Sequence, residues 1–549
     1  MTINIISKLF VLLFVACQSP EVFDDEYVKQ AIENGESSHE SFKRSLDFTR
    51  AWLKKVDPES GLIPSNLDSK LDFWDPANAA ADNYPFMVLT AYLLEDSLLN
   101  GPLLNILYQE KKLTSRVGVL PDVYVFSKKD FKETTVNKGQ LIFGASEYLK
   151  DGLIPLNELM GSSPWQDRMM EILEALSSIT KDFEDLEQYF SRSSVVAEIN
   201  GEMLQVLTRV FWMTGEEKYL NWAIEIADHY LLETDFSQIE YLKLRDHGSE
   251  IIGGLSELFF SLHWLGNPKA DFYRSPFYRL LDLILVYGRN SDGLFYNAIN
   301  LKTQTVVDDR IADTWGYILN AYYTVYLVDK KTEYIQAVRK PFEALNLDYR
   351  NYNWEPNRDQ GPLGSHDGYA DALESGINIL NRENNTQLSK WIDSEIEVMF
   401  GMQQDDGIIE GWHGDGNFAR TALMYGLWKT QGARVSPWND QLRLGAVPSE
   451  RGTYFVLSSE EEWHGQLFFD QKRHKNILNL PVDYPRINQF PEWFTLDPIL
   501  QYRITASQKN LSGTYIGEQL IEGIEVKLYA GETLKIVVEQ KTPLFKSGE

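Results

Sequence analysis

The chain has 549 residues, of which 43% are apolar and 13% aromatic, so it can form one very large domain or two to three ordinary ones. Its formal net charge of −28 at pH 7 repels nucleic acid and anionic lipid surfaces, and we expect neither as a partner. The same charge repels an anionic sugar at long range, so a uronate would need a locally basic pocket.

The N-terminus predicts a signal peptide over residues 1–16. Lys8 precedes an apolar run, residues 9–16, that is too short to span a bilayer permanently. The run ends at Cys17, the only cysteine, and Phe14-Val15-Ala16-Cys17 resembles a bacterial lipobox, although Phe14 departs from the usual Leu. That resemblance implies acylation of Cys17, a tether over residues 17–39 and a lipid-anchored protein of the bacterial cell envelope. The alternative is an ordinary secretory signal followed by a chance cysteine.

Helical apolar spacing dominates residues 40–435. Residues 98–150 give no clear pattern. The Gly253-Gly254 pair lies inside one helical stripe and lowers its helix propensity, so we expect another backbone to approach closely there. The spacing predicts helices over residues 42–56, 77–94, 165–181, 194–214, 217–232, 249–265, 275–289, 311–328, 332–346, 369–382, 388–403 and 417–430.

A weak internal repeat indicates paired helices. Turn signals followed by short apolar runs recur at Gly61, Gly152, Gly293 and Gly407, and small and polar residues begin the second helix of several pairs. This alternation resembles the (α/α)6 toroid of many carbohydrate-active enzymes, including glucuronyl hydrolases and polysaccharide lyases. The resemblance implies inner helices whose N-terminal ends converge on a central pocket. An α-solenoid binding scaffold is the alternative.

After Gly432 the pattern changes to alternating strands at residues 452–457, 466–470, 523–528 and 532–538. We therefore expect a mainly α protein in which a toroid of helical hairpins, residues 40–435, is followed by a small C-terminal antiparallel β domain, residues 436–549. An irregular aromatic segment, residues 484–493, either packs across the toroid or forms a surface loop.

Titratable and aromatic side chains gather at the expected entrances of the inner helices. Histidine is a ready acid or base near neutrality, and arginine can grip a carboxylate through two hydrogen bonds. Each residue can instead be structural, as a cap, an ion-pair partner or part of the core. The candidate catalytic residues are His247, Glu250, Tyr317, His366 and His413, and the candidate substrate-binding residues are Arg245, Arg310, Asp313, Trp315, Trp412 and Arg420. We expect His247, Glu250, Arg310, Tyr317, His366, His413 and Arg420 to line one cavity.

Carboxylates are abundant at the same places, and a glycosidase needs two of them facing the scissile bond. No GxGxxG after a strand, P-loop lysine motif or HExxH occurs, and the lone cysteine excludes a thiolate zinc site, so we expect no cofactor and no metal. His366 with Asp367, or His413 with Asp415, is the minority alternative for a metal. The carboxylate candidates are Asp82, Glu202, Asp246, Glu250, Asp313, Asp371 and Asp415.

The combination of lipoprotein signal, toroid and β domain resembles secreted carbohydrate-degrading enzymes of glycan-utilising bacteria, in particular glucuronate-directed β-glucuronidases and oligosaccharide dehydratases acting on algal, ulvan-like sugars. The resemblance implies an oligosaccharide or polysaccharide substrate and an enzyme of the lyase or hydrolase class. We expect β-elimination at a uronate, with neutral His247 as the base. Hydrolysis by two carboxylates is the first alternative, and a non-catalytic surface glycan-binding lipoprotein is the second.

Overall fold

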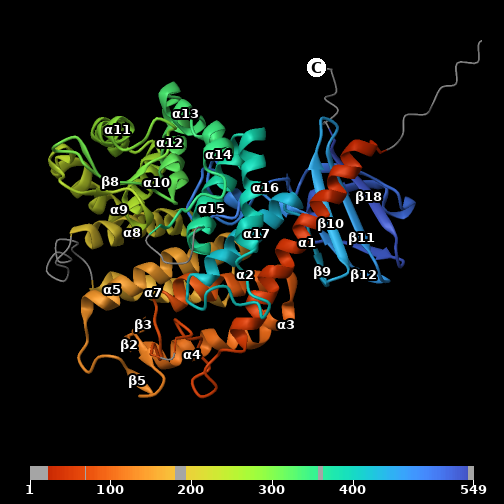
Figure 1. The fold of residues 1–549 in the computed structure, drawn as a ribbon, viewed down its shortest axis with the longest axis horizontal. Helices are drawn as coiled ribbons and strands as arrows, with labels where there is room; N and C mark the ends of the chain where they lie inside the picture. The colour runs from red at the N-terminus through yellow and green to blue at the C-terminus, as the bar shows by residue number, and fades with distance from the viewer. Residues whose placement is uncertain (1–22, 69, 180–192, 357–362, 542–549) are drawn as a thin grey trace, which may run out of the picture.

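The computed structural model describes residues 23–68, 70–179, 193–356 and 363–541. Its longest elements are α-helices, and antiparallel strands follow toward the C-terminus (Figure 1). The predicted fold class, an α/α toroid followed by β structure, is confirmed. The predicted signal peptide and the lipid site at Cys17 lie outside the described residues. Among the helices of the described ranges, none is both long and apolar enough to cross a membrane.

A ring of inner helical segments forms the centre of the toroid. Each segment packs against the next along the chain, and the last packs against the first, which closes the ring. Over the described residues the ring has seven members, one hairpin more than the six of the resemblance. They are η1 with α2 (Ala79–Asn83, Tyr84–Leu94), α5 with η3 and α6 (Lys138–Glu147, Tyr148–Leu153, Ile154–Met160), α8 (Ser193–Thr214), α10 (Glu250–Trp264), α12 (Trp315–Asp329), α15 (His366–Arg382) and α17 (Asp415–Lys429).

Outer helices cover this ring, each returning the chain to the entrance of the next inner segment. Apolar spacing predicted most of them to within a few residues. The exceptions are α1, which begins 17 residues before its predicted start at residue 42, and the region 98–150, where the sequence shows no clear pattern. The outer helices are α1 (Asp25–Leu53), η2 with α4 (Leu99–Leu103, Leu104–Thr114), α7 (Pro164–Ile179), α9 (Glu217–Asp228), α11 (Lys269–Tyr287), α13 with α14 (Thr332–Arg339, Phe342–Asp348) and α16 (Thr386–Phe400).

Two glycines bring the inner helices α8 and α10 into direct backbone contact. A Cβ at Gly254 would lie 2.6 Å from the carbonyl oxygen of Gly201, and a Cβ at Gly201 would lie 2.3 Å from the backbone nitrogen of Ile251. The expected close approach is therefore confirmed for Gly254, whereas Gly253 has only ordinary contacts. This packing fixes where the entrance of α10, which carries Glu250 of the cavity wall, lies relative to α8.

The C-terminal β structure consists mainly of two facing sheets. A five-stranded sheet has the order β10–β11–β18–β15–β16, and a three-stranded sheet has the order β17–β12–β9. Apolar side chains such as Leu457, Leu467 and Leu534 are buried between them. The strands are β9 (Arg434–Ser436), β10 (Leu442–Pro448), β11 (Thr453–Ser459), β12 (Trp463–Phe468), β15 (Gln501–Ala506), β16 (Gly513–Ile516), β17 (Ile524–Leu528) and β18 (Thr533–Gln540).

Two segments join the toroid to the β structure. Helix α1 begins at Asp25 and packs along β10 and β11 before it joins the toroid, so residues 25–39 are helical and not the predicted tether (Figure 1). The irregular segment after β12 packs against the toroid: Tyr484 contacts Phe260 of α10, and Arg486 forms an ion pair with Glu158 of α6 at 3.1 Å. Of the two interpretations of residues 484–493, packing across the toroid is therefore the correct one.

Candidate functional site

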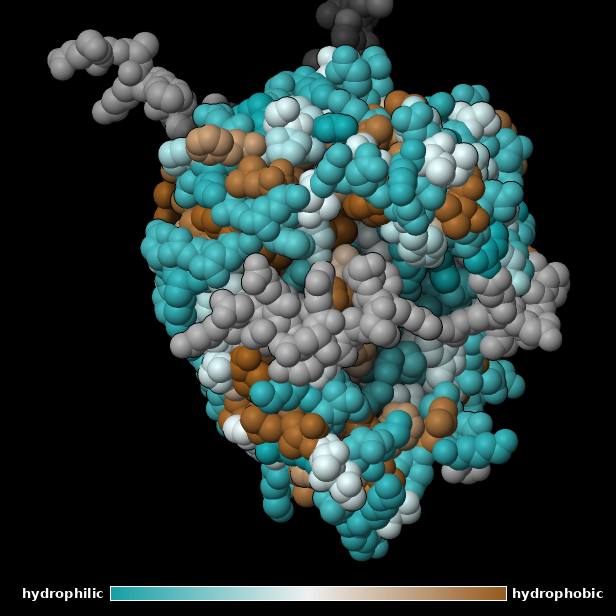
Figure 2. Space-filling view, turned by 90° about the vertical axis from the view of Figure 1, so that its left-hand side faces the viewer, coloured by the Kyte–Doolittle hydropathy of each residue, from teal (hydrophilic) through white to brown (hydrophobic). Residues whose placement is uncertain are grey.

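A polar cavity of about 340 Å³ lies where the entrances of the inner segments converge. One face of the toroid is visibly hollowed, with hydrophilic residues inside the hollow (Figure 2). The cavity is lined by Ala77, Asn78, Asp82, Phe143, Glu147, Lys150, Asp151, Arg245, Asp246, His247, Glu250, Tyr317, Glu355, Asp367, Asp371, Trp412, His413, Asn417, Arg420, Ile487 and Asn488.

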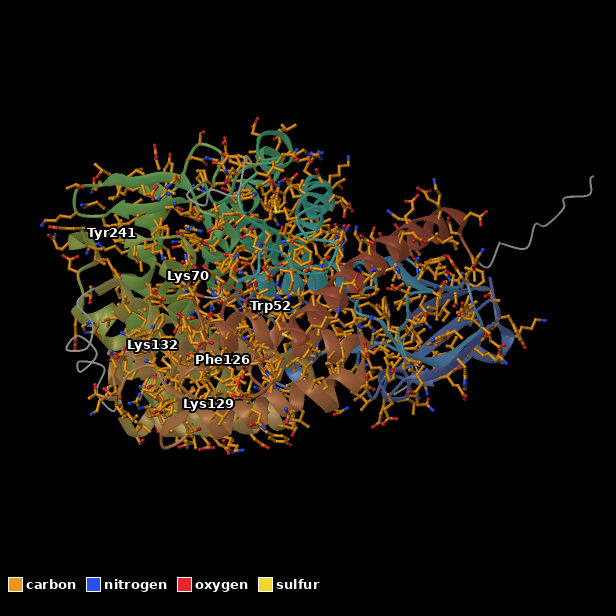
Figure 3. All side chains as sticks on the ribbon, turned by 60° about the horizontal axis from the view of Figure 1, so that its bottom comes forward. Trp52, Lys70, Phe126, Lys129, Lys132 and Tyr241 are labelled. Atoms are coloured by element: carbon orange, nitrogen blue, oxygen red, sulfur yellow. The ribbon has the colours of Figure 1, made fainter. Side chains whose placement is uncertain are left out.

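Connectors that precede the inner helices carry short strands, including β1 (Phe73–Trp74), β6 (Leu242–Lys243), β7 (Tyr296–Asn300) and β8 (Thr305–Ile311). In Figure 3, Phe126, Lys129 and Lys132 lie over the orange part of the toroid and Tyr241 lies over its green part. The Tyr241 ring is 53% exposed. These connectors therefore present aromatic and basic side chains at the surface.

The structure brings most of the predicted site residues together. Their common position follows from the entrances of the inner helices, where the chain turns from a connector into a helix. The predicted residues that line the cavity are His247, Glu250, Tyr317, His413, Arg245, Trp412 and Arg420. The expectation of a shared cavity is wrong for Arg310 and His366, and Asp313 and Trp315 are also absent from the cavity wall.

His366 is fully buried behind the cavity wall. Its Nδ1 lies 3.0 Å from Glu410 Oε1, and its Nε2 lies 3.7 Å from Asp415 Oδ1. Burial lowers the pKa of His366, but Glu410 and Asp415 raise it to about 9. The Asp415 carboxylate also accepts hydrogen bonds from the backbone N–H groups of Glu410 and Gly411. Both residues therefore hold the connector that carries Trp412.

The other three exceptions have equally simple causes. Asp313 is 1% exposed because Arg245 donates to both of its carboxylate oxygens, at 3.0 and 2.6 Å. Trp315 is fully buried and packs edge-on against Trp391, so it belongs to the core. Arg310 lies on β8, where its guanidinium pairs with Asp308. None of the β8 residues lines the cavity.

Each lysine and arginine in the cavity wall is paired with carboxylates, over the residues that the structure describes. Lys150 Nζ lies 2.7 Å from Asp151 and 2.5 Å from Glu250. Arg245 binds Asp313 and Glu355, and Arg420 binds Asp371 at 2.8 Å and Glu374 at 3.0 Å. These cations therefore neutralise the protein's own acids and are already engaged.

His247 lies in the turn before α10, surrounded by carboxylates. Its Nε2 is 3.3 Å from Asp246 Oδ1, and its Nδ1 is 3.6 Å from Glu147 Oε1 and 3.7 Å from Glu198 Oε1. Burial lowers the pKa of His247, but Asp246 and Glu198 raise it to about 10. The expected neutral imidazole is therefore wrong for the chain alone, because carboxylates outweigh the helix dipole.

Two carboxylic acids of neighbouring inner segments face the cavity in different environments. Burial first, and then the nearby charge of Asp151, raise the pKa of Asp82 well above its usual range. Asp151 instead accepts hydrogen bonds from Lys150 Nζ at 2.7 Å and from the Asn488 side chain at 2.5 Å. The surroundings of Asp82 thus favour its protonated form, whereas Asp151 sits among donors that stabilise its ionised form.

A further acid pair lies on α15, one helical turn apart. Burial first, and then Asp371 and Glu355, raise the pKa of Asp367 to about 7. The Asn417 side-chain amide donates to Asp367 at 2.9 Å, while Arg420 donates to Asp371. The i, i+4 spacing places both carboxyl groups on the inward face of the helix.

Sequence reasoning missed several residues of the wall. Asp151 was interpreted as part of a turn because Asp-Gly is a turn signal, yet Gly152 lies inside a continuous helical segment. A Cβ at Gly152 would lie 2.8 Å from the Ala80 carbonyl oxygen, so close packing with the neighbouring segment explains this glycine. The spacing Glu147, Lys150, Asp151 on one helical face was the available signal. Other polar residues that the sequence analysis missed include Glu147, Lys150, Glu355 and Asn488.

No protein-family model matches the sequence, and no curated protein matches it. Similar solved structures include an inactive variant of the α-1,6-mannanase of Salegentibacter sp. HEL1_6 in complex with α-1,6-mannotetrose, at 9% identity over 70% of this chain and 98% of that chain, with a TM-score of 0.41. The unsaturated glucuronyl hydrolase of Bacillus sp. GL1 is similar at 12% identity over 54% and 88% of the two chains, with a TM-score of 0.37. Cellobiose 2-epimerase of Bacillus thermoamylovorans B4167 is similar at 10% identity over 70% and 97%, with a TM-score of 0.38.

Proposed function

We propose that the protein is a carbohydrate-active enzyme that hydrolyses a glycosidic bond in the central cavity. The observation that carries this proposal is the pairing of Asp82 and Asp151. The pKa of one carboxyl group is raised and the other carboxyl group is surrounded by donors, in adjoining inner segments that line one cavity. Two carboxylic acids with opposite protonation states are the equipment that glycoside hydrolysis requires.

Asp82 is the proposed general acid. Burial and the charge of Asp151 penalise the ionised form of Asp82 and raise its pKa well above the usual range of an aspartate. When the glycosidic bond breaks, Asp82 donates its proton to the leaving-group oxygen. His413 Nε2 lies 3.8 Å from Asp82 Oδ2, so a second titratable group adjoins the acid.

Asp151 is the proposed ionised partner. Lys150 and Asn488 hold its carboxylate in one orientation, and Lys150 is itself anchored by Glu250 at 2.5 Å. From that position the carboxylate stabilises the positive charge that develops on the sugar ring. It also assists the attack of the water molecule that is added to the sugar when the glycosidic bond breaks. Trp412 and Phe143 supply apolar surfaces in the same wall. Aromatic rings of this kind stack on the C–H faces of sugars.

The pairing of the cavity cations favours hydrolysis over elimination. Elimination at a uronate needs a cation that neutralises the sugar carboxylate, and the lysine and arginines of this wall already bind the protein's acids. Several acids remain to accept hydrogen bonds from sugar hydroxyl groups. We therefore propose an uncharged glycan as substrate.

Product analysis with neutral and uronate-containing oligosaccharides tests this proposal. Hydrolysis gives saturated fragments that carry one added water, with no new ultraviolet absorbance. Asp82→Asn and Asp151→Asn should each lower the rate by about 10²–10⁴-fold. Asp308→Asn, which removes an acid paired with Arg310 outside the cavity, is the control and should keep full activity.

Two other outcomes would reject this assignment. An ultraviolet-absorbing, unsaturated product from a uronate oligosaccharide would establish elimination instead. Oligosaccharide binding without turnover, unchanged in Asp82→Asn, would favour a non-catalytic glycan-binding protein.

We also propose that the chain is lipid-anchored at Cys17 in a bacterial cell envelope, on the evidence of the apolar run and lipobox-like residues before it. Cys17→Ser should move the protein from the membrane fraction to the soluble fraction. Equal membrane association of the wild type and the variant would contradict lipid attachment at this residue.

A further inference from the structure

A second group of titratable residues adjoins the cavity, and two of its members, Glu147 and His247, line the cavity wall. The group consists of Glu147, Glu198, Glu202 and His247, and one potential ligand atom from each lies within 4.8 Å of the others. Glycoside hydrolysis as proposed above uses none of these four side chains. We call them the Glu147 cluster.

Three separate inner segments build the cluster. Glu147 ends α5, and His247 lies in the turn before α10. Glu198 and Glu202 are four residues apart on α8, so both carboxylates project from one face of that helix. Like charges at this spacing repel each other, which disfavours the arrangement unless a cation lies between them.

Several oxygens of the cluster are buried without a hydrogen-bond donor. Glu202 is fully buried, and neither of its carboxylate oxygens has a partner. Glu147 is 2% exposed, and its Oε1 also has no partner. A buried carboxyl oxygen that accepts no hydrogen bond is costly, since it has lost its hydration and gained little in exchange. These unpartnered atoms therefore point to a ligand.

The orientation of His247 fits a metal ligand. Its Nδ1 faces Glu147 Oε1 at 3.6 Å and Glu198 Oε1 at 3.7 Å, which is too long for hydrogen bonds. Ligand atoms about 2.0–2.2 Å from one ion are separated by roughly 3 to 3.7 Å. The other ring nitrogen, Nε2, lies 3.3 Å from Asp246 Oδ1. A carboxylate behind the second nitrogen is the usual support for a metal-binding histidine.

We propose that the Glu147 cluster binds one divalent transition-metal ion through carboxylate oxygens of Glu147, Glu198 and Glu202 and through Nδ1 of His247. Three oxygen ligands and one imidazole suit Zn²⁺ or Mn²⁺. The ion replaces the proton on Nδ1 and provides a positive partner for the buried Glu202 oxygens. By joining α5, α8 and the turn before α10, it stabilises one wall of the cavity.

A second cluster of potential metal ligands in the same chain differs from the Glu147 cluster, because protein groups already bind its acids. His474, Asp483 and Glu492 also lie within ligand distance of one another. There, however, Asp483 binds Arg382 at 2.6 Å and Arg486 at 3.0 Å, and Glu492 accepts from the His474 backbone N–H. Protein cations and donors already satisfy these acids, so this cluster needs no ion.

Metal content and thermal stability, measured without substrate, test the proposal. The full-length protein is treated with EDTA, dialysed, and titrated with Zn²⁺, Mn²⁺ or Ca²⁺ by calorimetry and by thermal unfolding. We expect one equivalent of Zn²⁺ or Mn²⁺ per chain and a rise in Tm of several degrees, because an ion that binds only the folded state stabilises it.

Glu202→Gln should abolish stoichiometric binding and the metal-dependent rise in Tm, while Glu492→Gln, in the contrasting cluster, should leave both unchanged. If Glu202→Gln does not fold, the EDTA-treated wild type still decides the question. Absence of a stoichiometric ion, or of a Tm response to Zn²⁺ and Mn²⁺, overturns the proposal. Binding of Ca²⁺ alone overturns the assignment to a transition metal. Because no substrate is present, failure here leaves the proposed hydrolysis untouched.

Discussion

The side-chain amide of Asn488 donates to Asp151 Oδ1 at 2.5 Å, which joins the segment after β12 to the centre of the toroid. The Asn488 side-chain oxygen accepts from Arg420 at 2.9 Å, and its backbone N–H donates to Glu374 at 2.6 Å. One residue of the C-terminal region therefore orients the proposed ionised carboxylate and its neighbouring arginine.

Replacing Asn488 with glycine should reduce activity by about 10- to 100-fold, because Asp151 loses a donor that fixes its carboxylate. Glycine suits this position, since Asn488 has a φ of +60° and the backbone can keep its conformation. Steady-state kinetics measure the loss. The control is Asn479→Gly, at a φ of +59° outside the cavity. Equal rates for the two variants would show that the Asn488 amide does not position Asp151.

Replacing Asp367 with asparagine should stabilise the protein above pH 7 and have little effect at pH 4. The folded-state pKa is about 7, whereas the unfolded value is about 4, so the native state holds a proton that it loses as pH rises. Asp367 thus favours folding at low pH, and this contribution disappears as pH rises toward 7. We expect the free energy of unfolding of Asp367→Asn to exceed that of the wild type by roughly 1–3 kcal/mol at pH 8. Urea unfolding at pH 4.5 and pH 8 measures this difference in the free energy of unfolding. Asp405→Asn, which replaces an exposed acid in a loop, is the control.

Replacing His366 with glutamine should remove a stabilising contribution that depends on pH. The folded-state pKa of about 9 exceeds the unfolded value of about 6.5. The contribution is therefore complete below pH 6.5 and lost as pH rises through 9. The free energy of unfolding of the wild type should exceed that of His366→Gln by about 3 kcal/mol at pH 6 and by much less at pH 9.5. Denaturant unfolding at both pH values gives the difference. His464→Gln, exposed and paired with Glu525, should show no such change. A difference independent of pH would contradict a protonated His366.

The two arginines of the predicted substrate-binding set should respond very differently to truncation. Arg245→Ala leaves Asp313 buried without its cation, which should lower the free energy of unfolding by about 3–5 kcal/mol. Arg310→Ala breaks a partly exposed pair with Asp308 on β8 and should change it by less than about 0.5 kcal/mol, with unchanged activity. Thermal or urea unfolding of both variants checks the contrast. A large loss of activity in Arg310→Ala would place that arginine in the substrate site after all.

Local patterns in the sequence predicted most of the long helices and four of the C-terminal strands, β11, β12, β17 and β18. Apolar spacing predicted α8 and α10 almost to the residue, because apolar side chains recur at every helical turn along the buried face of a helix. The glycine pair in α10 indicated a close backbone approach, and the structure shows it at Gly254. Polar residues at the inner-helix entrances correctly indicated where a cavity would form, since the segments converge at those ends.

Only the tertiary structure decided which polar side chains reach the cavity. His413 lines it and His366 is buried behind it, although both stand at an inner-helix entrance. The hydrogen bond between Asp151 and Asn488 joins residues 337 positions apart, and no local pattern encodes a contact of that range. Burial periodicity specifies a face, whereas the partner on that face depends on how helices from distant parts of the chain pack. The protonation states of Asp82 and Asp151 follow from those partners, so the sequence alone leaves them undetermined.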